Sequence, residues 1–258
     1  GESWNGAHES YWHQFPDGVD PYVEKGNPES GLLWGISPEG TMPEPGKGAD
    51  RVQAYNYRIC VTFDKENQVP FPKPDNYYPS RYELLIRTIE AQPGLGIREY
   101  FIISPMPNNK TDINNRGAFS TDMIGMNHNY PEASYEEREK IIKAHKDYTL
   151  GLLWFWTHDE RIPEYLQKEI TCMGLPKDEY VEYDHWTPKL YIREARRMIG
   201  EYVATQADCE LRTSPEDYVG WAAYGMDSHN CQRIVVERDG KKMVKNEGDV
   251  EIGVKAPY

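Results

Sequence analysis

The seven residues from Leu150 to Trp156, which read Leu-Gly-Leu-Leu-Trp-Phe-Trp, constrain the fold of this chain more than any other segment. They lie near the end of a stretch from Pro131 to about Thr157 that predicts the longest helix, with Pro131 in its first turn. A helical segment that is apolar on every side has no face for solvent. We therefore expect Leu150 to Trp156 to lie buried at the centre of the protein.

The first 50 residues have a different composition from the rest. They contain nine glycines and six prolines, and nine acidic against two basic residues. So many turn-forming residues prevent long regular elements. Because this segment also carries many aromatic and leucine side chains, it is too apolar for a free linker. The sequence predicts an irregular arm over residues 1–50, packed on a mixed body over residues 51–258.

Strand and helix signals follow one another in the body without regular alternation. The patterns predict strands over 52–63 and 99–104, and Asp239-Gly240 predicts a hairpin turn between two β-rich runs. Helices are expected after the capping box Ser80-x-x-Glu83 and over 163–173 and 187–204, whereas 108–129 has too many Asn, Gly and Asp residues for a regular element. The predicted fold class is a mixed α+β fold.

Charge and composition exclude several classes of partner. Lys and Arg number 29 against 42 Asp and Glu, a net charge of −13 that repels polyphosphate backbones, so no nucleic-acid partner is expected. No apolar run reaches the roughly 18–20 residues of a membrane span, so no membrane partner is expected. A removed export signal is compatible with the sequence, and we favour a periplasmic or secreted location over a cytoplasmic one.

Metal and nucleotide motifs are also missing from the sequence. The four cysteines include no C-x-x-C pair, and the seven histidines include no helical pair of metal ligands, so no metal site is predicted. Gly94-Leu-Gly96 lacks a third glycine and follows a helix, and Gly46-Lys-Gly48 lacks the spacing of a P-loop. This sequence therefore shows no nucleotide-binding turn.

Polar side chains crowd into the segment from residue 109 to 122, where Asp112, Asn114 and Asn115 are candidates for binding a ligand. Such side chains often bond only their own backbone in turns, and that alternative stays open. On the helix expected over 187–204, Arg193, Arg196 and Arg197 share one face. They need acidic partners or an anion, and an internal ion-pair network is the alternative to a binding site.

A third cluster is Asp227-Ser-His229-Asn230. A histidine beside Asp, Ser and Asn can act as a general base with orienting partners, since imidazole titrates near neutrality. A single histidine in a turn can equally be structural. The spacing leaves both interpretations open.

These clusters belong to long motifs that occur in a specific order: Gln53-Ala-Tyr-Asn-Tyr-Arg58, Asn109-Lys-Thr-Asp-Ile-Asn-Asn115, Gly151-Leu-Leu-Trp-Phe155, Tyr191-Ile-Arg-Glu-Ala-Arg-Arg-Met198, Met226-Asp-Ser-His-Asn-Cys-Gln-Arg233 and Asn246-Glu-Gly-Asp249. Together they resemble the FAD-dependent oxidoreductases whose bacterial members are often labelled xanthan lyase. The resemblance covers the chain from about Asn5 to Tyr258.

The chain departs from that family in one respect. Family members carry a glycine-rich FAD-binding strand-turn-helix before this region and a further flavin-contacting segment after it, and neither is present in this sequence. The resemblance therefore implies the substrate-binding insertion of a Rossmann-type FAD enzyme. FAD is the expected cofactor of the complete protein, held with FAD-binding segments of the same or a partner chain. Binding of FAD by this segment alone is not expected.

The resemblance also implies site roles. The expected reaction oxidises a hydroxyl-bearing small molecule or carbohydrate, with hydride passing to the flavin and the hydroxyl proton to a protein base. The expected base is His229, oriented by Asp227 or Asn230. The residues expected to hold substrate hydroxyls are Asp112, Asn114, Asn115 and Arg58. The residues expected to be structural or close to the flavin are Arg193, Arg196 and Arg197. We further expect the segment around Asp112 to Asn115 to meet the turn around His229 at one concave site.

Two other classes of protein fit the composition. A cofactor-free polysaccharide hydrolase or lyase needs only a carboxylate or Tyr-His pair, which 42 acidic residues would conceal. A non-catalytic carbohydrate-binding module would present an exposed aromatic row, with Trp4, Trp12 and Trp34 as candidates.

Overall fold

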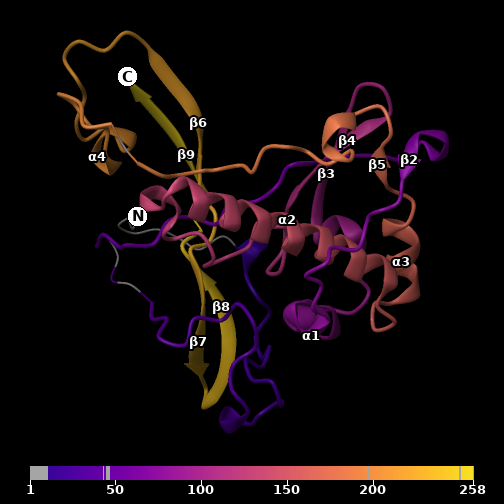
Figure 1. Ribbon diagram of the computed structural model, residues 1–258. Helices are drawn as coiled ribbons and strands as arrows, with labels where there is room; N and C mark the ends of the chain where they lie inside the picture. The colour runs from indigo at the N-terminus through magenta and orange to yellow at the C-terminus, as the bar shows by residue number, and fades with distance from the viewer. Residues whose placement is uncertain (1–10, 43, 45–46, 197, 250, 258) are drawn as a thin grey trace.

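The computed structural model describes residues 11–42, 44, 47–196, 198–249 and 251–257 (Figure 1). Its α-helices are α1 (Glu83–Ala91), α2 (Tyr135–His158), α3 (Glu164–Ile170) and α4 (Gln206–Cys209). Its strands are β1 (Ile59–Thr62), β2 (Gln68–Val69), β3 (Phe101–Met106), β4 (Lys110–Asn115), β5 (Leu175–Pro176), β6 (Trp221–Asp227), β7 (Gln232–Arg238), β8 (Lys241–Glu247) and β9 (Glu251–Pro257). All strand pairs in the described residues are antiparallel, and the mixture of helices and small sheets confirms the α+β class.

Helix α2 runs through the middle of the molecule (Figure 1). It begins four residues later than predicted, because the Ser134 side chain caps it by accepting a hydrogen bond from the Glu137 amide at 3.2 Å. Pro131 lies instead in a short 3₁₀ turn before the helix. Residues 150–156 are buried in α2 except for Trp154, which is partly exposed, so the predicted central position of this segment is confirmed.

Aromatic side chains from distant segments surround this part of α2. Tyr100 and Tyr82 lie against it, with ring centroids 5.1 Å from those of Trp156 and Phe155 respectively. Trp34 stacks on Tyr148 at 5.6 Å. The core therefore surrounds α2 with side chains from several segments, and does not cover only one side of the helix.

The main sheet has the strand order β1-β4-β3. The expectation that residues 108–129 are irregular is wrong for β4, whose backbone pairs with a neighbour on each side. Pairing on both sides outweighs the low strand propensity of Asn and Asp. The predicted strand over 52–63 is reduced to β1, because the Ala54 amide donates instead to the Asn230 carbonyl and the Asn56 carbonyl accepts from Tyr191.

The predicted helix over 187–204 is also wrong. The described part of this segment is extended, and it is held by contacts to distant residues: Tyr191 forms a bridge to Asn56, and the Glu194 carbonyl accepts from the Tyr55 hydroxyl. These tertiary hydrogen bonds replace the local bonds of a helix. Arg193 and Arg196 therefore do not share a helical face.

Other local predictions have mixed outcomes. The hairpin is confirmed, since β7 and β8 flank Asp239 and Gly240, whose φ angles of 52° and 71° suit a type I′ turn. The capping box does not form, because residues 79–82 are a 3₁₀ turn and α1 begins only at Glu83 without a side-chain cap. Strand β3 lies two residues beyond its predicted position, and α3 falls within the predicted 163–173.

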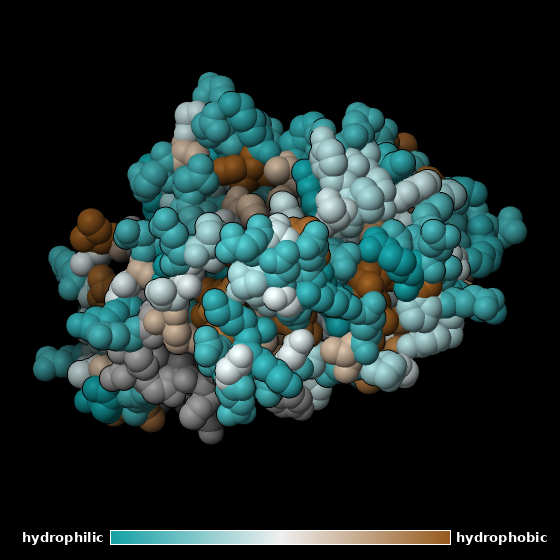
Figure 2. All heavy atoms as spheres, turned by 90° about the horizontal axis from the view of Figure 1, so that it is seen from below, coloured by the Kyte–Doolittle hydropathy of each residue, from teal (hydrophilic) through white to brown (hydrophobic). Residues whose placement is uncertain are grey.

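The described residues of the predicted arm contain only short 3₁₀ turns, bends and isolated bridges, and they bury apolar side chains against the body. Its buried members are Phe15, Val19, Tyr22, Leu33 and Ile36. The division of the chain at residue 50 stays a prediction. The face in Figure 2 is mainly hydrophilic, with hydrophobic side chains in separate small areas. No helix in the described ranges is long and apolar enough to span a bilayer.

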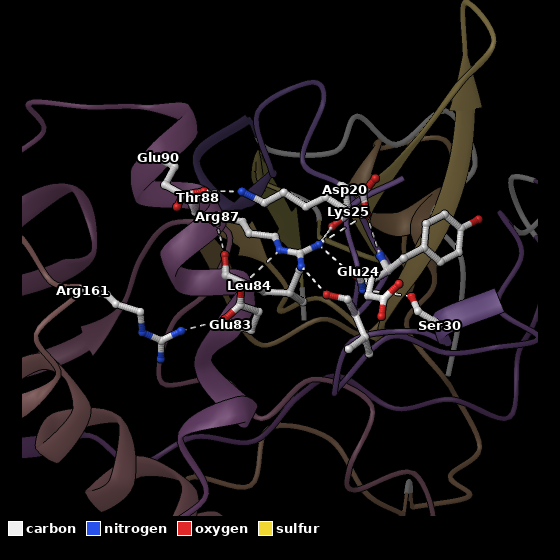
Figure 3. A network of polar contacts seen from close by, with 12 residues as sticks. Asp20, Glu24, Lys25, Ser30, Glu83, Leu84, Arg87, Thr88, Glu90 and Arg161 are labelled. Carbon is white, nitrogen blue, oxygen red and sulfur yellow. Dashed lines mark hydrogen bonds and ion pairs between the residues drawn. The ribbon is translucent and has the colours of Figure 1, made fainter. Parts of the chain in front are cut away.

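Arg87 of α1 fastens the arm to the body (Figure 3). Its guanidinium, only 4% exposed, donates to the carbonyl oxygens of Asp20, Tyr22 and Val23 at 2.9, 2.6 and 3.0 Å. Glu83, one turn earlier in α1, adds an ion pair at 3.4 Å. One buried cation thus satisfies three backbone acceptors of a segment that has no regular structure of its own.

We expect Arg87→Met to lower the free energy of unfolding by about 3 kcal/mol, because it leaves these backbone acceptors without donors. Lys25→Met is the matched control, since Lys25 lies in the same arm but forms an exposed ion pair with Glu90. It should cost less than about 1 kcal/mol. Urea unfolding measures both, and equal losses would contradict the anchoring role of Arg87.

His145 is a buried histidine of α2, and its Nδ1 lies 2.8 Å from the Ile141 carbonyl oxygen. Burial lowers its pKa to about 4 from an ordinary 6.5. Between these two pH values the unfolded chain binds a proton that the folded protein does not. Stability should therefore fall as the pH is lowered through this window, by a few kcal/mol at most.

His145→Leu should flatten this part of the stability profile, since it removes the group that titrates only in the unfolded chain. His158→Gln, at the exposed end of the same helix, should keep the slope. Unfolding free energies measured at intervals from pH 4 to 7 test this. An unchanged slope in His145→Leu would show that other groups cause the pH dependence.

Candidate functional site

His229 and Asp122 form a buried pair. Nδ1 of His229 lies 2.9 Å from Oδ1 of Asp122, although the two residues are 107 positions apart in the sequence. His229 is 6% exposed and Asp122 1%. An imidazole that donates from Nδ1 to a carboxylate has its tautomer set, with Nε2 as the basic nitrogen.

The second carboxylate oxygen of Asp122 is also occupied. Oδ2 accepts a hydrogen bond from Nδ2 of Asn115 at 3.1 Å, and the Asp122 backbone amide donates to the Ser120 hydroxyl at 3.2 Å. The carboxylate therefore has no freedom to turn away from His229. Asn115, Asp122 and His229 make one connected polar chain inside the protein.

The backbone around His229 is held by the segment that precedes β1. The His229 amide donates to Oε1 of Gln53 at 2.8 Å, and the Ala54 amide donates to the Asn230 carbonyl at 3.0 Å. These bonds hold the turn between β6 and β7 against Gln53 and Ala54, which precede β1. The position of the imidazole thus depends on residues from three distant parts of the chain.

Asp227 and Asn230, the expected orienting partners, have other contacts. Asp227 is half-exposed and pairs with Arg193, whose Nη2 lies 3.3 Å from Oδ1 of Asp227. Asn230 is buried and meets Ala54 through its carbonyl. The structure gives the place beside the imidazole to Asp122, a residue that the sequence analysis did not single out. The sequence feature that could have revealed Asp122 is that it is the one charged residue between Ala118 and Ile124, where the other side chains are apolar or carry a hydroxyl.

The expected substrate-holding residues are divided by the alternation of β4. Asn115 points to the His229 pair, whereas Asp112, three residues earlier in a strand, lies on the opposite face. There it forms an ion pair with Arg58 of the neighbouring segment. Asn114 accepts a hydrogen bond from Asn56 at 3.0 Å. Of the segment from Asp112 to Asn115, the structure therefore brings Asn115 to the His229 pair and turns Asp112 away from it. The predicted concave site stays a prediction.

Arg193 and Arg196 are paired with acidic residues, as the ion-pair alternative requires. Arg193 donates from Nε to Oε1 of Gln53 at 3.2 Å, the same oxygen that accepts from the His229 amide, and so lies close to the site. Arg196 makes a two-bond contact with Glu132 at 2.9 and 3.0 Å. Arg197 lies outside the described residues.

The described residues do not fit the pyrophosphate of FAD. Dinucleotide sites need a parallel strand-turn-helix with free amides at the helix N-terminus, and here every described strand pair is antiparallel. Each α-helix also carries an acidic residue in its first turn: Glu83 in α1, Glu136 and Glu137 in α2, Glu164 in α3 and Asp208 in α4. These carboxylates repel an anion. Within the described ranges there is also no group of three or more candidate metal ligands.

The aromatic row considered for a carbohydrate-binding module is not formed by the described residues. Trp34 packs against Tyr148, and Trp12 lies under the guanidinium of Arg116 at 4.8 Å. Trp4 is outside the described residues. The geometry thus concentrates the chemistry at His229 and Asp122.

No curated protein and no solved structure matches this chain. One family model does, that of the FAD dependent oxidoreductases, and it matches residues 16–258. The matched region includes β4, Asp122 and the turn that carries His229. Because the match extends over nearly all of the sequence, the chain belongs to the family of FAD-dependent oxidoreductases.

Proposed function

We propose that this chain is the substrate-side part of an FAD-dependent oxidoreductase, in which His229 takes the hydroxyl proton of a small-molecule or carbohydrate alcohol. The observation that carries the proposal is the buried contact of His229 with Asp122 at 2.9 Å. Family membership supplies the reaction class, and the polar chain supplies a base with a defined orientation.

The two partners of the base have separate tasks in this proposal. Asp122 holds Nδ1, so that Nε2 receives the proton, and its carboxylate stabilises the imidazolium that forms. Asn115 donates from Nδ2 to Asp122, and this bond holds the carboxylate beside His229. We also propose that Asp112, Asn114 and Arg58 contact substrate hydroxyls. No hydrogen bond in the described residues joins these side chains to His229.

The cofactor places a further requirement on the protein. FAD accepts hydride in enzymes of this class. The residues described here do not form a binding site for its pyrophosphate. We propose that FAD-binding segments of the same or a partner chain complete the enzyme. The role of the present residues is to hold the alcohol and to move its proton.

We expect the printed chain, produced alone, to retain no flavin after gel filtration with excess FAD. The reason is that its helices start with acidic residues and its net charge is −13. The visible flavin absorbance of the protein peak measures this. Stoichiometric flavin in that peak would refute the proposal that other segments hold the cofactor.

In the flavin-containing enzyme, His229→Gln should slow substrate oxidation by about 10²–10⁴-fold, because a positioned base is lost. Asp122→Asn should slow it by about 10²-fold or more, since an amide favours the wrong tautomer. Asp227→Asn should have a smaller effect than Asp122→Asn, as its side chain contacts Arg193 instead of the imidazole. Steady-state rates compare the three variants.

His158→Gln serves as the histidine control for these rates, because it removes an imidazole at the exposed end of α2. Flavin content should be equal in all variants. A His229→Gln enzyme with an unchanged rate would exclude His229 as the base. A larger loss for Asp227→Asn than for Asp122→Asn would show that the wrong carboxylate has been assigned.

A further inference from the structure

Arg233 of β7 is a buried cation whose hydrogen-bonding capacity the described residues leave largely unused. Its side chain is 0% exposed, and none of its three guanidinium nitrogens makes a hydrogen bond of ordinary geometry to the residues that the structure describes. Burying such a group without partners costs several kcal/mol. Something in this region must therefore accept the hydrogen bonds that its five N–H groups can donate.

The nearest protein groups supply too few acceptors. The Phe119 ring covers one face of the guanidinium at 4.8 Å, and the backbone of Gly35 closes another side, since a β-carbon there would lie 2.8 Å from Nη1. The Tyr148 hydroxyl donates to the Ser120 carbonyl at 2.7 Å, and its oxygen also acts on Arg233 as a hydrogen-bond acceptor. The two lone pairs of one hydroxyl cannot satisfy five N–H groups. Asp122 acts on Arg233 through its charge, and no hydrogen bond joins the two side chains.

An unsatisfied acceptor lies directly across the hairpin. Asn246 of β8 is the register partner of Arg233, so both side chains leave the same face of the ribbon. Asn246 is 0% exposed, and its Nδ2 donates to the carbonyl oxygens of His13 and Ala118 at 2.7 and 2.8 Å. Its Oδ1 has no partner in the described part of the chain. Unsatisfied donors and an unsatisfied acceptor therefore share one buried space.

We propose that Arg233 and Asn246 enclose a buried water site, in which at least one water accepts a hydrogen bond from the guanidinium and donates one to Oδ1 of Asn246. Water suits this position because it both accepts and donates. An anion would satisfy Arg233 but would face the lone pairs of Oδ1. The charge of Arg233 also needs no further anion, since Asp122 and Tyr148 partly offset the effect of burial, which lowers the pKa of Arg233.

The water site has a structural consequence for the catalytic pair. Asn246 binds Ala118, and Arg233 lies on Phe119, so both residues hold the segment that leads to Asp122. The bridge joins this segment to the β7–β8 hairpin beneath His229. It is inferred from the contacts of Arg233 and Asn246, and it does not depend on the proposed role of His229.

A double-mutant cycle tests the bridge. Urea unfolding gives the stability of Arg233→Met, of Asn246→Leu and of the double variant. Asn246→Leu also removes the bonds to His13 and Ala118, but it does so both with Arg233 and with Arg233→Met, so that loss cancels in the coupling. The expected coupling is about 5- to 30-fold in the unfolding equilibrium constant. The control cycle pairs Arg233→Met with Lys241→Met, at the exposed turn end of the hairpin, and should couple by less than about twofold.

Additive effects of Arg233→Met and Asn246→Leu would overturn the bridge. So would a higher stability of Arg233→Met than of the unaltered chain, since a guanidinium without partners is better replaced by an apolar side chain.

A high-resolution crystal structure of the unaltered chain gives a second test that needs no variant to fold. We expect solvent density within about 2.7–3.2 Å of both a guanidinium nitrogen of Arg233 and Oδ1 of Asn246. A crystal soaked in bromide tests for an anion by anomalous scattering. Bromide at this position, direct contact between Arg233 and Asn246, or no density between them would each refute the proposal.

Discussion

The fold depends on burying the apolar segment Leu150 to Trp156 of α2. Because Leu150 to Trp156 has no polar face, one sheet or one helix cannot cover it, and the chain brings the irregular arm, the turn before α1 and the start of β3 around it. Segments with little regular structure of their own are fixed in this way. Trp34 of the arm is held through Tyr148, and the arm is fastened again by the buried guanidinium of Arg87.

The same packing creates the polar centre. Phe119 lies edge-on to Tyr82 and beside Tyr148. This packing holds the residues that follow Phe119, up to Asp122, in the interior of the protein. A carboxylate buried there must be hydrogen-bonded. The Asp122 carboxylate meets this requirement with His229 and Asn115, which come from the turn after β6 and from β4. The same packing of side chains therefore forms both the apolar core and the buried contact between Asp122 and His229.

Local patterns predicted those elements whose stability is local. The hairpin around Asp239-Gly240 needs only two positive φ angles, and the start of α2 needs only a Ser cap. The segment over 187–204 shows the opposite case. Its apolar spacing is helical, yet its backbone bonds go to Asn56 and Tyr55, so tertiary hydrogen bonds decide its conformation. Strand β4 likewise exists because β1 and β3 pair with it.

By itself, the sequence determined the family, through long motifs in a specific order, as well as the buried helix and the hairpin. It also brought His229 and Asn115 forward as candidates. Only the tertiary structure decided that Asp122 lies between them, that the alternation of β4 turns Asp112 toward Arg58, and that Arg233 faces Asn246. The physical reason is that periodicity and capping act over a few residues, whereas a hydrogen bond between residues 107 positions apart exists only after packing has brought them together.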